Sequence, residues 1–306
     1  MKACQLCPRR CKVDRVKALG FCGAGENLRV ALVSLHKWEE PCLVGENGAG
    51  TIFFSHCNLK CVYCQNFSIS NGGFGADISI ERLAEIFIEQ QQRGAANIEL
   101  VTPTHYTDKI CTAIDIAKSR GLNLPIVWNS NAYENISTLE LLRGRVDIFL
   151  PDLKYFDDEN ARIFSNAPNY FNVAAAAIKK MFELAGSPKF DGDKMIRGMI
   201  VRHLVLPNFR RDSIKIVDWL YKTFGDDIFI SLMNQYTPIF RAGEFKKISR
   251  PLTTFEYQSV VDHAAKLGVK NCFIQLGKTA DKNFIPNFNL DNVNRMSDSD
   301  FQKSPD

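Results

Sequence analysis

Three cysteines, Cys57, Cys61 and Cys64, stand close together in the segment FFSHCNLKCVYCQN. Their C-x3-C-x2-C spacing puts three thiolates on one short loop, where they can bind three corners of a cubane iron–sulfur cluster. Such clusters usually have four thiolate ligands. With three, one iron keeps an open coordination position, as catalytic metal sites do. The spacing therefore predicts a cluster that can bind a substrate or cofactor directly.

Two other interpretations of this loop are open. A zinc site would need a fourth ligand, and His56 is adjacent in sequence. Successive side chains of an extended strand end point to opposite faces, which directs His56 away from Cys57. A thioredoxin-like pair of Cys61 and Cys64 would normally have only two cysteines, between a strand and a helix. The three-cysteine spacing favours the cluster over both.

A second group of cysteines lies near the N-terminus, with the spacing C-x2-C-x3-C-x10-C. Four thiolates can bind structural zinc or a second iron–sulfur cluster, and they can also stay reduced or form disulfides. The interleaved Arg9, Arg10 and Lys12 would lower the thiol pKa values in each case. The choice stays open for this group, which consists of Cys4, Cys7, Cys11 and Cys22.

The elements that must position these cysteines alternate along the chain from residue 51. Apolar strand-like runs alternate with stretches of helical spacing, which argues for a parallel sheet covered by helices. We predict an α/β fold with a full or partial (β/α) barrel, and a doubly wound open sheet as the alternative. Functional residues should then lie at the C-terminal strand ends. The predicted strands are 51–56, 97–102, 125–130, 147–152, 195–207, 227–236 and 271–275, and the predicted helices 78–94, 107–120, 137–143, 157–166, 169–186, 211–224 and 255–268.

Composition sets the broad class and the domain organisation. The net charge of +4 comes without a dense Lys/Arg block, so we expect no nucleic-acid partner. The absence of a secretory signal or a membrane-length apolar run predicts a cytoplasmic protein without a membrane partner. Ten cysteines then indicate metal or redox chemistry more than disulfides. We divide the chain into a Cys-rich extension (1–50), a barrel core (51–276) and a polar tail (277–306) that we expect to be mobile.

The C-x3-C-x2-C motif resembles the signature of the radical S-adenosylmethionine (SAM) superfamily. That resemblance implies a radical SAM barrel, a 4Fe-4S cluster on the three cysteines, and SAM on the open iron. It implies an oxidoreductase that cleaves SAM to a 5′-deoxyadenosyl radical, supplied with electrons by a donor such as flavodoxin or ferredoxin. The family places an aromatic residue before the third cysteine, against the adenine, and Tyr63 has that place.

Longer stretches are similar to the activase branch of this superfamily, typified by pyruvate formate-lyase activating enzyme. They are GENGAGTIFFSHCNLKCVYCQN, LVTPTHY, WNSNAYE, LPDLKYFDDENA, RHLVLPN and MNQYTP. The similarity implies a lyase-activating enzyme that takes hydrogen from a backbone glycine of a glycyl radical enzyme. Another peptide or a small molecule is the alternative substrate, since similarity at SAM-binding positions says little about the hydrogen donor. A non-enzymatic zinc or redox sensor is the alternative class.

The same resemblance implies SAM-binding side chains, and no catalytic side chain beyond them is assigned. Arg202 suits the SAM carboxylate through charge-assisted hydrogen bonds, although it could instead pair with a structural carboxylate. Activases use an acidic residue near SAM to help hold a cation, and the neutral Asn129 and Ser130 at this place argue against a cation here. The implied set is Tyr63, Asn66, Asn129, Asp152, Lys154 and Arg202.

One departure from the family pattern concerns the SAM amino group. Many radical SAM enzymes contact this group through a Gly-Gly-Glu run after the second strand. Here the corresponding stretch reads VTPTHY, so Thr102, Thr104 or His105 would have to replace the contact. A lone histidine is as often structural as functional.

Overall fold

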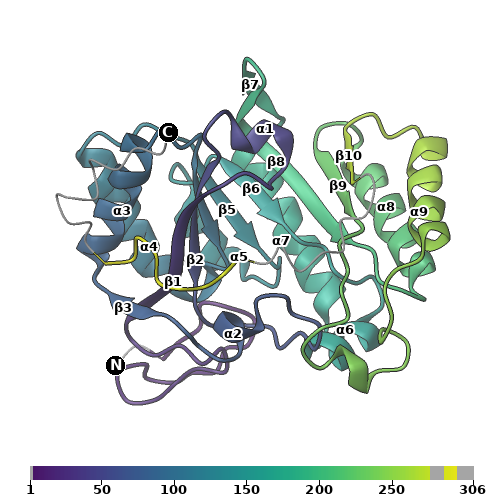
Figure 1. The fold of residues 1–306 in the computed structure, drawn as a ribbon, viewed down its shortest axis with the longest axis horizontal. Helices are drawn as coiled ribbons and strands as arrows, with labels where there is room; N and C mark the ends of the chain where they lie inside the picture. The colour runs from purple at the N-terminus through teal and green to yellow at the C-terminus, as the bar shows by residue number, and fades with distance from the viewer. Residues whose placement is uncertain (1–2, 276–285, 295–306) are drawn as a thin grey trace.

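The computed structural model of the protein describes residues 3–275 and 286–294. Its described residues form one sheet in the order β10-β9-β8-β6-β5-β4-β2-β1-β3, with β7 paired to β8 (Figure 1). The strands are β1 (Leu28–His36), β2 (Ala49–Phe54), β3 (Ala76–Ile78), β4 (Ile98–Val101), β5 (Ile126–Ser130), β6 (Ile148–Pro151), β7 (Lys189–Asp191), β8 (Lys194–Leu204), β9 (Phe229–Met233) and β10 (Cys272–Ile274).

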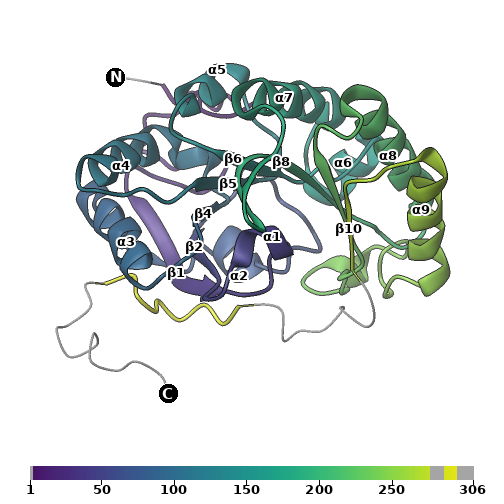
Figure 2. The ribbon, with the colours of Figure 1, turned by 90° about the horizontal axis from the view of Figure 1, so that it is seen from above.

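Helices cover one face of this sheet. Figure 2 shows α3, α4, α5, α7, α8 and α9 following one another around its outside. The helices are α1 (Pro41–Val44), α2 (Phe67–Ser70), α3 (Ile80–Gln92), α4 (Thr107–Ser119), α5 (Ile136–Leu139), α6 (Asp158–Ser165), α7 (Tyr170–Ala185), α8 (Arg210–Phe224) and α9 (Thr254–Leu267), with 3₁₀ helices η1 (Thr104–Tyr106), η2 (Glu140–Leu142) and η3 (Ala242–Glu244). Within the described part of the chain, none of them has the length and apolar character needed to cross a bilayer.

The strands β2, β4, β5, β6, β8, β9 and β10 run parallel. The two ends of the described sheet, β10 and β3, do not pair, so the sheet curves without closing. This confirms the α/β prediction, as a partial (β/α) barrel. All seven strands predicted from residue 51 onward are present, with shifted ends.

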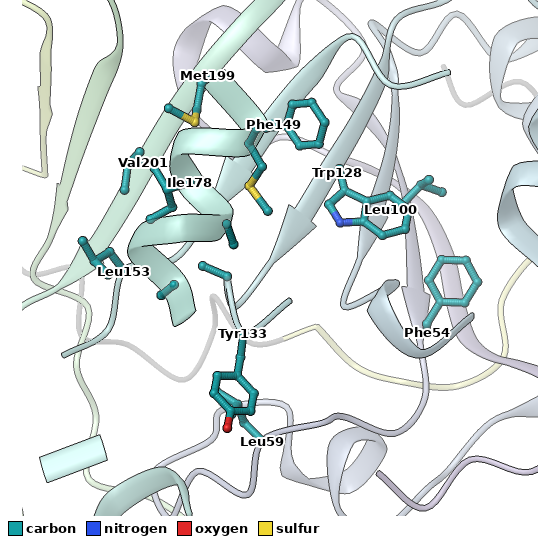
Figure 3. Close-up of a cluster of buried hydrophobic side chains, with 14 of the residues drawn as sticks. Phe54, Leu59, Leu100, Trp128, Tyr133, Phe149, Leu153, Ile178, Met199 and Val201 are labelled. Carbon is teal, nitrogen blue, oxygen red and sulfur yellow. The ribbon is translucent and has the colours of Figure 1, made fainter. Parts of the chain in front are cut away.

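Alternation along the strands separates an outer from an inner face, because successive side chains point to opposite sides of a sheet. Outward residues pack under the helices in one large core. Figure 3 shows part of this core, with Trp128 of β5, Phe149 of β6 and Ile178 of α7. The residues between them, such as Asn129 and Arg202, are left for the inner face, where the cavity described below lies.

The inner face is covered at one end by α1. Cys42 and Leu43 of α1 are buried against Val127, Ile148 and Ile200, which are inward residues of β5, β6 and β8. A proline in its first turn suits so short a helix, because proline lacks the amide that the first turn cannot pair. The segment before α1 is thereby fixed beside β8.

The short elements β3, β7, α1 and α2 were not predicted from the sequence, and the two ends of the chain also differ from what it suggested. The strand β1 was not predicted; it lies inside the segment 1–50 and pairs antiparallel with β2 and β3. Within the expected tail, residues 286–294 are bonded to the sheet: Leu290 N donates to Ala31 O at 3.1 Å, and Val33 N donates to Asp291 O at 3.0 Å. These bonds cover the free edge of β1. The rest of the predicted tail, apart from these residues, lies outside the described residues.

Candidate active site

The cysteine loop follows β2 directly, at the C-terminal end of the parallel strands. Two of its backbone amides are fixed by the last carbonyls of α6: Lys60 N donates to Ser165 O at 3.1 Å and Val62 N to Phe164 O at 2.8 Å. Asn166 ends α6 in the left-handed conformation, with φ 49°. The helix end therefore satisfies its own orphan carbonyls by holding the loop.

The three thiols of this loop line one cavity of about 400 Å³. Burial raises the pKa of Cys57 to about 12 and that of Cys64 to about 11, and it also raises the pKa of Cys61. Neutral thiols are therefore the stable form here until a metal binds them. The donors to Cys57 are Leu59 N (3.4 Å) and Asn131 Nδ2 (3.4 Å), and the donor to Cys61 is Ser165 Oγ (2.9 Å). The Ser70 hydroxyl lies 3.2 Å from Cys64 Sγ, and either group can donate.

An ion pair faces these thiols from the end of β6. Lys154 Nζ lies 2.6 Å from Asp152 Oδ2, and both side chains line the cavity. Burial alone would lower the pKa of Lys154, but the Asp152 carboxylate holds it above its usual value. The pair is therefore more enclosed than the simple surface pair considered from the sequence.

Arg202, on the inner face of β8, is bound by two carboxylates. Its Nε lies 2.8 Å from Glu40 Oε1 and its Nη2 lies 2.5 Å from Glu40 Oε2, while Nη2 also contacts Glu39. Burial opposes both charges, yet Arg202 lowers the pKa of Glu40 and the glutamates raise that of Arg202. Sequence reasoning missed both glutamates; the Glu-Glu-Pro run before α1 was the available signal.

Asn129 reaches the cavity from β5 and donates through Nδ2 to Glu99 Oε1 at 2.6 Å. Glu99 is fully buried behind it, and burial raises the pKa of Glu99 to about 8. Its Oε2 has no hydrogen-bond partner among the described residues. Glu99 was also missed, although a carboxylate inside the apolar run NIELVT was a visible signal.

The three residues considered as replacements for the missing Gly-Gly-Glu contact differ in whether they reach the cavity. Thr102 lines the cavity. Thr104 is buried and donates to Glu134 Oε1 at 2.9 Å, and the buried His105 ring bonds Ser55 O at 2.8 Å. Burial lowers the pKa of His105 to about 3. The geometry leaves Thr102 as the candidate that reaches the cavity.

Tyr63 and Asn66 flank the third cysteine and line the cavity with it. The Tyr63 hydroxyl lies 2.6 Å from that of Tyr155, and its ring packs edge-on against Tyr236, with centroids 5.7 Å apart. Tyr63 is thus held from two sides. Asn66 stands before α2, and no hydrogen bond from its side chain caps that helix.

His56, the candidate zinc ligand, packs against two glycines. A Cβ on Gly23 would lie 2.9 Å from its Nδ1, and one on Gly73 would lie 2.7 Å from its Cε1. The ring therefore needs glycine at both places. In residues 3–275 and 286–294, no group of three or more His, Cys, Asp or Glu side chains is arranged to hold a single metal ion.

The N-terminal cysteines gather beside this site. Cys11 Sγ and Cys22 Sγ lie 3.6 and 3.2 Å from where a Gly20 Cβ would be. The segment is tied to the cysteine loop, because Lys60 Nζ donates to Cys22 O at 3.4 Å and Arg9 Nε to Asn58 O at 2.9 Å. In Figure 1 this segment, drawn in purple, runs beneath the sheet next to α2.

The cysteine loop and the strands β4, β5, β6 and β8 fall within one known family pattern. The family model of the radical SAM superfamily matches residues 51–218. The chain belongs to the radical SAM superfamily. This supports the recognition made from the cysteine spacing at the level of the superfamily, and with it the assignment as an enzyme.

Two similar proteins illustrate the likeness. The chain is 33% identical over 275 residues to the uncharacterized protein MJ0674 of Methanocaldococcus jannaschii, covering 87% of this chain and 75% of that protein. Its fold is similar to that of Streptococcus suis SuiB bound to precursor peptide SuiA, with a TM-score of 0.51 and 15% identity over 72% of this chain and 46% of SuiB. The SuiB structure bound to SAM gives the same TM-score. This radical SAM chain spans about half the length of SuiB, and the likeness shows the fold alone.

The donor set fits the cofactors that the superfamily implies, a 4Fe-4S cluster and SAM. Cys57, Cys61 and Cys64 supply three sulfurs to one cavity, which matches a cluster with one iron left for SAM. The cysteine sulfurs that bind a four-iron cluster lie farther apart than those that bind one metal ion. A cluster site therefore does not have the arrangement of a single-ion site. In the same cavity, the Asp152–Lys154 pair and Arg202 carry charges of both signs, the kind that can pair with the charged groups of SAM.

Proposed function

We propose that this radical SAM enzyme cleaves SAM reductively and uses the product radical to take a hydrogen atom from its substrate. When bound, the reduced cluster supplies one electron that converts SAM to methionine and a 5′-deoxyadenosyl radical, which then becomes 5′-deoxyadenosine. The observation that carries the proposal is the shared cavity, which three thiols line together with Asp152, Lys154 and Arg202. The protein's part is to orient and shield the cofactors.

The residues of the cavity would share this task. Tyr63 is held by Tyr155 and Tyr236 and presents its ring to the adenine. Lys154, next to Asp152, offers a cation to the SAM carboxylate. Arg202 is already bound to Glu39 and Glu40, so only its remaining N–H groups can contact the SAM carboxylate. Asn66, Asn129 and Thr102 supply neutral polar contacts.

For the substrate, we propose a backbone glycine of a partner glycyl radical enzyme. The support is the similarity of LPDLKYFDDENA and RHLVLPN to activases. Another peptide or a small molecule is the second candidate, and the SuiB structure with its precursor peptide shows that this fold accommodates a peptide in that protein. Flavodoxin or ferredoxin would supply the electron.

Incubating the reconstituted protein with SAM, reductant and a candidate glycyl radical enzyme should produce a glycyl radical EPR doublet on the partner. The partner's glycine-to-alanine variant is the control and should give none. Sustained 5′-deoxyadenosine formation that depends on a small molecule, with no EPR signal on any partner, would contradict the activase assignment while leaving SAM cleavage intact.

We also propose that the four N-terminal cysteines bind a structural metal, with zinc first and a second cluster as the alternative. In the described residues these sulfurs are not arranged as a single-ion site, so zinc would have to draw them together. Backbone amides already point at these sulfurs: that of Arg9 bonds Cys7, and that of Ala24 lies 3.4 Å from Cys22 Sγ. Such bonds favour the thiolate form that metals require, but burial outweighs them here: it raises the pKa of Cys7 to about 11 and also raises the pKa of Cys22. The lowered thiol pKa expected from Arg9, Arg10 and Lys12 is therefore wrong for Cys7 and Cys22. The chain segment around them lacks helices and strands as far as it is described, so a metal would stabilise it.

Metal analysis of a Cys57→Ala/Cys61→Ala/Cys64→Ala variant isolates this second group. We expect one zinc per chain, or iron and sulfide if the alternative holds, and loss of that metal in Cys7→Ala/Cys22→Ala. If the triple loop variant, which keeps all four N-terminal cysteines, binds neither zinc nor iron at pH 7.5 with zinc supplied, the N-terminal site is ruled out.

A further inference from the structure

Each sulfur of the cysteine loop has a polar side chain at hydrogen-bond distance, and one of these side chains stands at the end of a buried hydroxyl relay. We propose that this relay, Tyr63–Tyr155–Ser165, donates a hydrogen bond to Cys61 and thereby raises the reduction potential of the bound cluster. Ser165 is thus a positioning residue that acts through the cysteine. The inference rests on the proposed function, because it presupposes the cluster on Cys61.

The relay is continuous and closed to solvent. Ser165 Oγ lies 2.9 Å from Cys61 Sγ, the Tyr155 hydroxyl lies 2.7 Å from Ser165 Oγ, and the Tyr63 hydroxyl lies 2.6 Å from that of Tyr155. Ser165 and Tyr155 are 0% and 1% exposed, and Tyr63 is 6% exposed. Among the residues that the structure describes, these three hydroxyl groups have only one another and the Cys61 sulfur as hydrogen-bond partners.

The direction of each hydrogen bond in the relay follows from the number of protons available. A hydroxyl group has one proton, and a cysteine that binds iron is a thiolate, so it can only accept. Ser165 therefore donates to Cys61, Tyr155 donates to Ser165, and Tyr63 donates to Tyr155. Hydrogen bonds aligned in one direction polarise one another, so the last bond, onto the sulfur, is strengthened by the two behind it.

A donor on a ligand sulfur favours the cluster state with more electron density. Reduction adds one negative charge to the cluster and its thiolates, and a hydrogen bond to sulfur stabilises that charge. Hydrogen bonds to sulfur are among the factors that set cluster potentials. Asn131 and Ser70 reach Cys57 and Cys64 at 3.4 and 3.2 Å, both longer than the Ser165 contact. We therefore assign the largest share of the effect to Ser165.

The fold explains why the Ser165 hydroxyl points at Cys61 Sγ. Ser165 is the last residue of α6, and its own carbonyl accepts the amide of Lys60. The same residue thus holds the cysteine loop through its backbone and contacts Cys61 through its side chain. The distance between Oγ and Sγ is fixed by the two bonds that fasten the loop to α6.

The test is a potentiometric titration of the reconstituted cluster, followed by the EPR signal of its reduced state. Ser165→Ala should keep its iron and lower the midpoint potential, so that the oxidised-to-reduced ratio at the wild-type midpoint rises roughly tenfold, or about 59 mV for one electron. Tyr155→Phe keeps the serine and removes the donor behind it, so its shift should have the same sign and be smaller. The matched control is Ser187→Ala, an exposed serine whose hydroxyl lies 3.3 Å from Asp227.

A wild-type potential in Ser165→Ala, with full iron content, would overturn the proposal. If that variant fails to hold iron, Tyr155→Phe decides: a lowered potential supports the relay and an unchanged one refutes it. Failure of the proposed function looks different, since the wild-type protein would then bind no cluster or release no 5′-deoxyadenosine.

Discussion

Replacing Arg202 by methionine should lower the free energy of unfolding by about 3–5 kcal/mol, the usual cost of removing one partner from a buried ion pair. Arg202 and its partners Glu39 and Glu40 have side chains that are only 12%, 9% and 6% exposed. Without the guanidinium, two carboxylates remain together in a largely closed space. Urea unfolding at pH 7.5 measures the loss.

The stability difference between the wild-type protein and Arg202→Met should depend on pH. In the wild-type protein Arg202 lowers the pKa of Glu40, so this pair stabilises the fold above the unfolded pKa of the carboxyl and the effect is lost as pH falls through the folded pKa. In Arg202→Met burial, the largest influence on Glu40, is opposed only by hydrogen bonds from Ser231 and from the Glu40 amide. The pKa of Glu40 should therefore rise, and the variant should regain stability on acidification. The difference between the two proteins should therefore shrink from pH 7.5 to pH 5.

Two variants complete this test. Arg202→Met/Glu40→Gln should recover part of the loss, because one of the stranded charges is gone. Arg241→Met, which breaks an exposed pair with Glu244, should unfold close to wild type. A single Arg202→Met variant within about 1 kcal/mol of wild type would show that the glutamates find other partners.

Replacing any one of Cys57, Cys61 and Cys64 by alanine should abolish stable cluster binding. Each thiol supplies one of the three protein ligands, and two thiolates do not hold a cubane that normally has four ligands. Iron and sulfide content after anaerobic reconstitution should fall to what the N-terminal cysteines hold, which is background if that group binds zinc. The brown absorbance should fall with it.

The chain offers a matched control for these substitutions. Cys111 is a buried cysteine in α4 whose thiol lies 3.5 Å from Leu141 O, within the helical layer. Cys111→Ala should keep the full iron content despite the same chemical change. A single loop variant that retains wild-type iron would mean that another residue replaces the missing thiol.

The strand ends are predictable from the sequence because alternation of strands and helices is a local pattern. That pattern places Asn129 and Asp152 at the ends of β5 and β6, and both residues line the cavity. The cysteine loop follows β2, as its position after an apolar run implies. Parallel strands bring their C-terminal ends to one edge, so local prediction is enough to bring these residues together.

Other parts of the site depend on contacts between distant segments. Arg202 pairs with Glu39 and Glu40, about 160 residues earlier in the chain, because α1 packs inside the partial barrel. No periodicity in the sequence encodes that contact. The inward direction of Thr102 and the burial of His105 likewise depend on how η1 turns after β4.

The most direct measurement is the release of 5′-deoxyadenosine by anaerobically reconstituted protein given SAM and dithionite. We expect steady release by the wild-type and Cys111→Ala proteins and none by Cys57→Ala, Cys61→Ala or Cys64→Ala. Equal release by the wild-type and the three loop variants, or none from a wild-type protein that carries its full cluster, would contradict it.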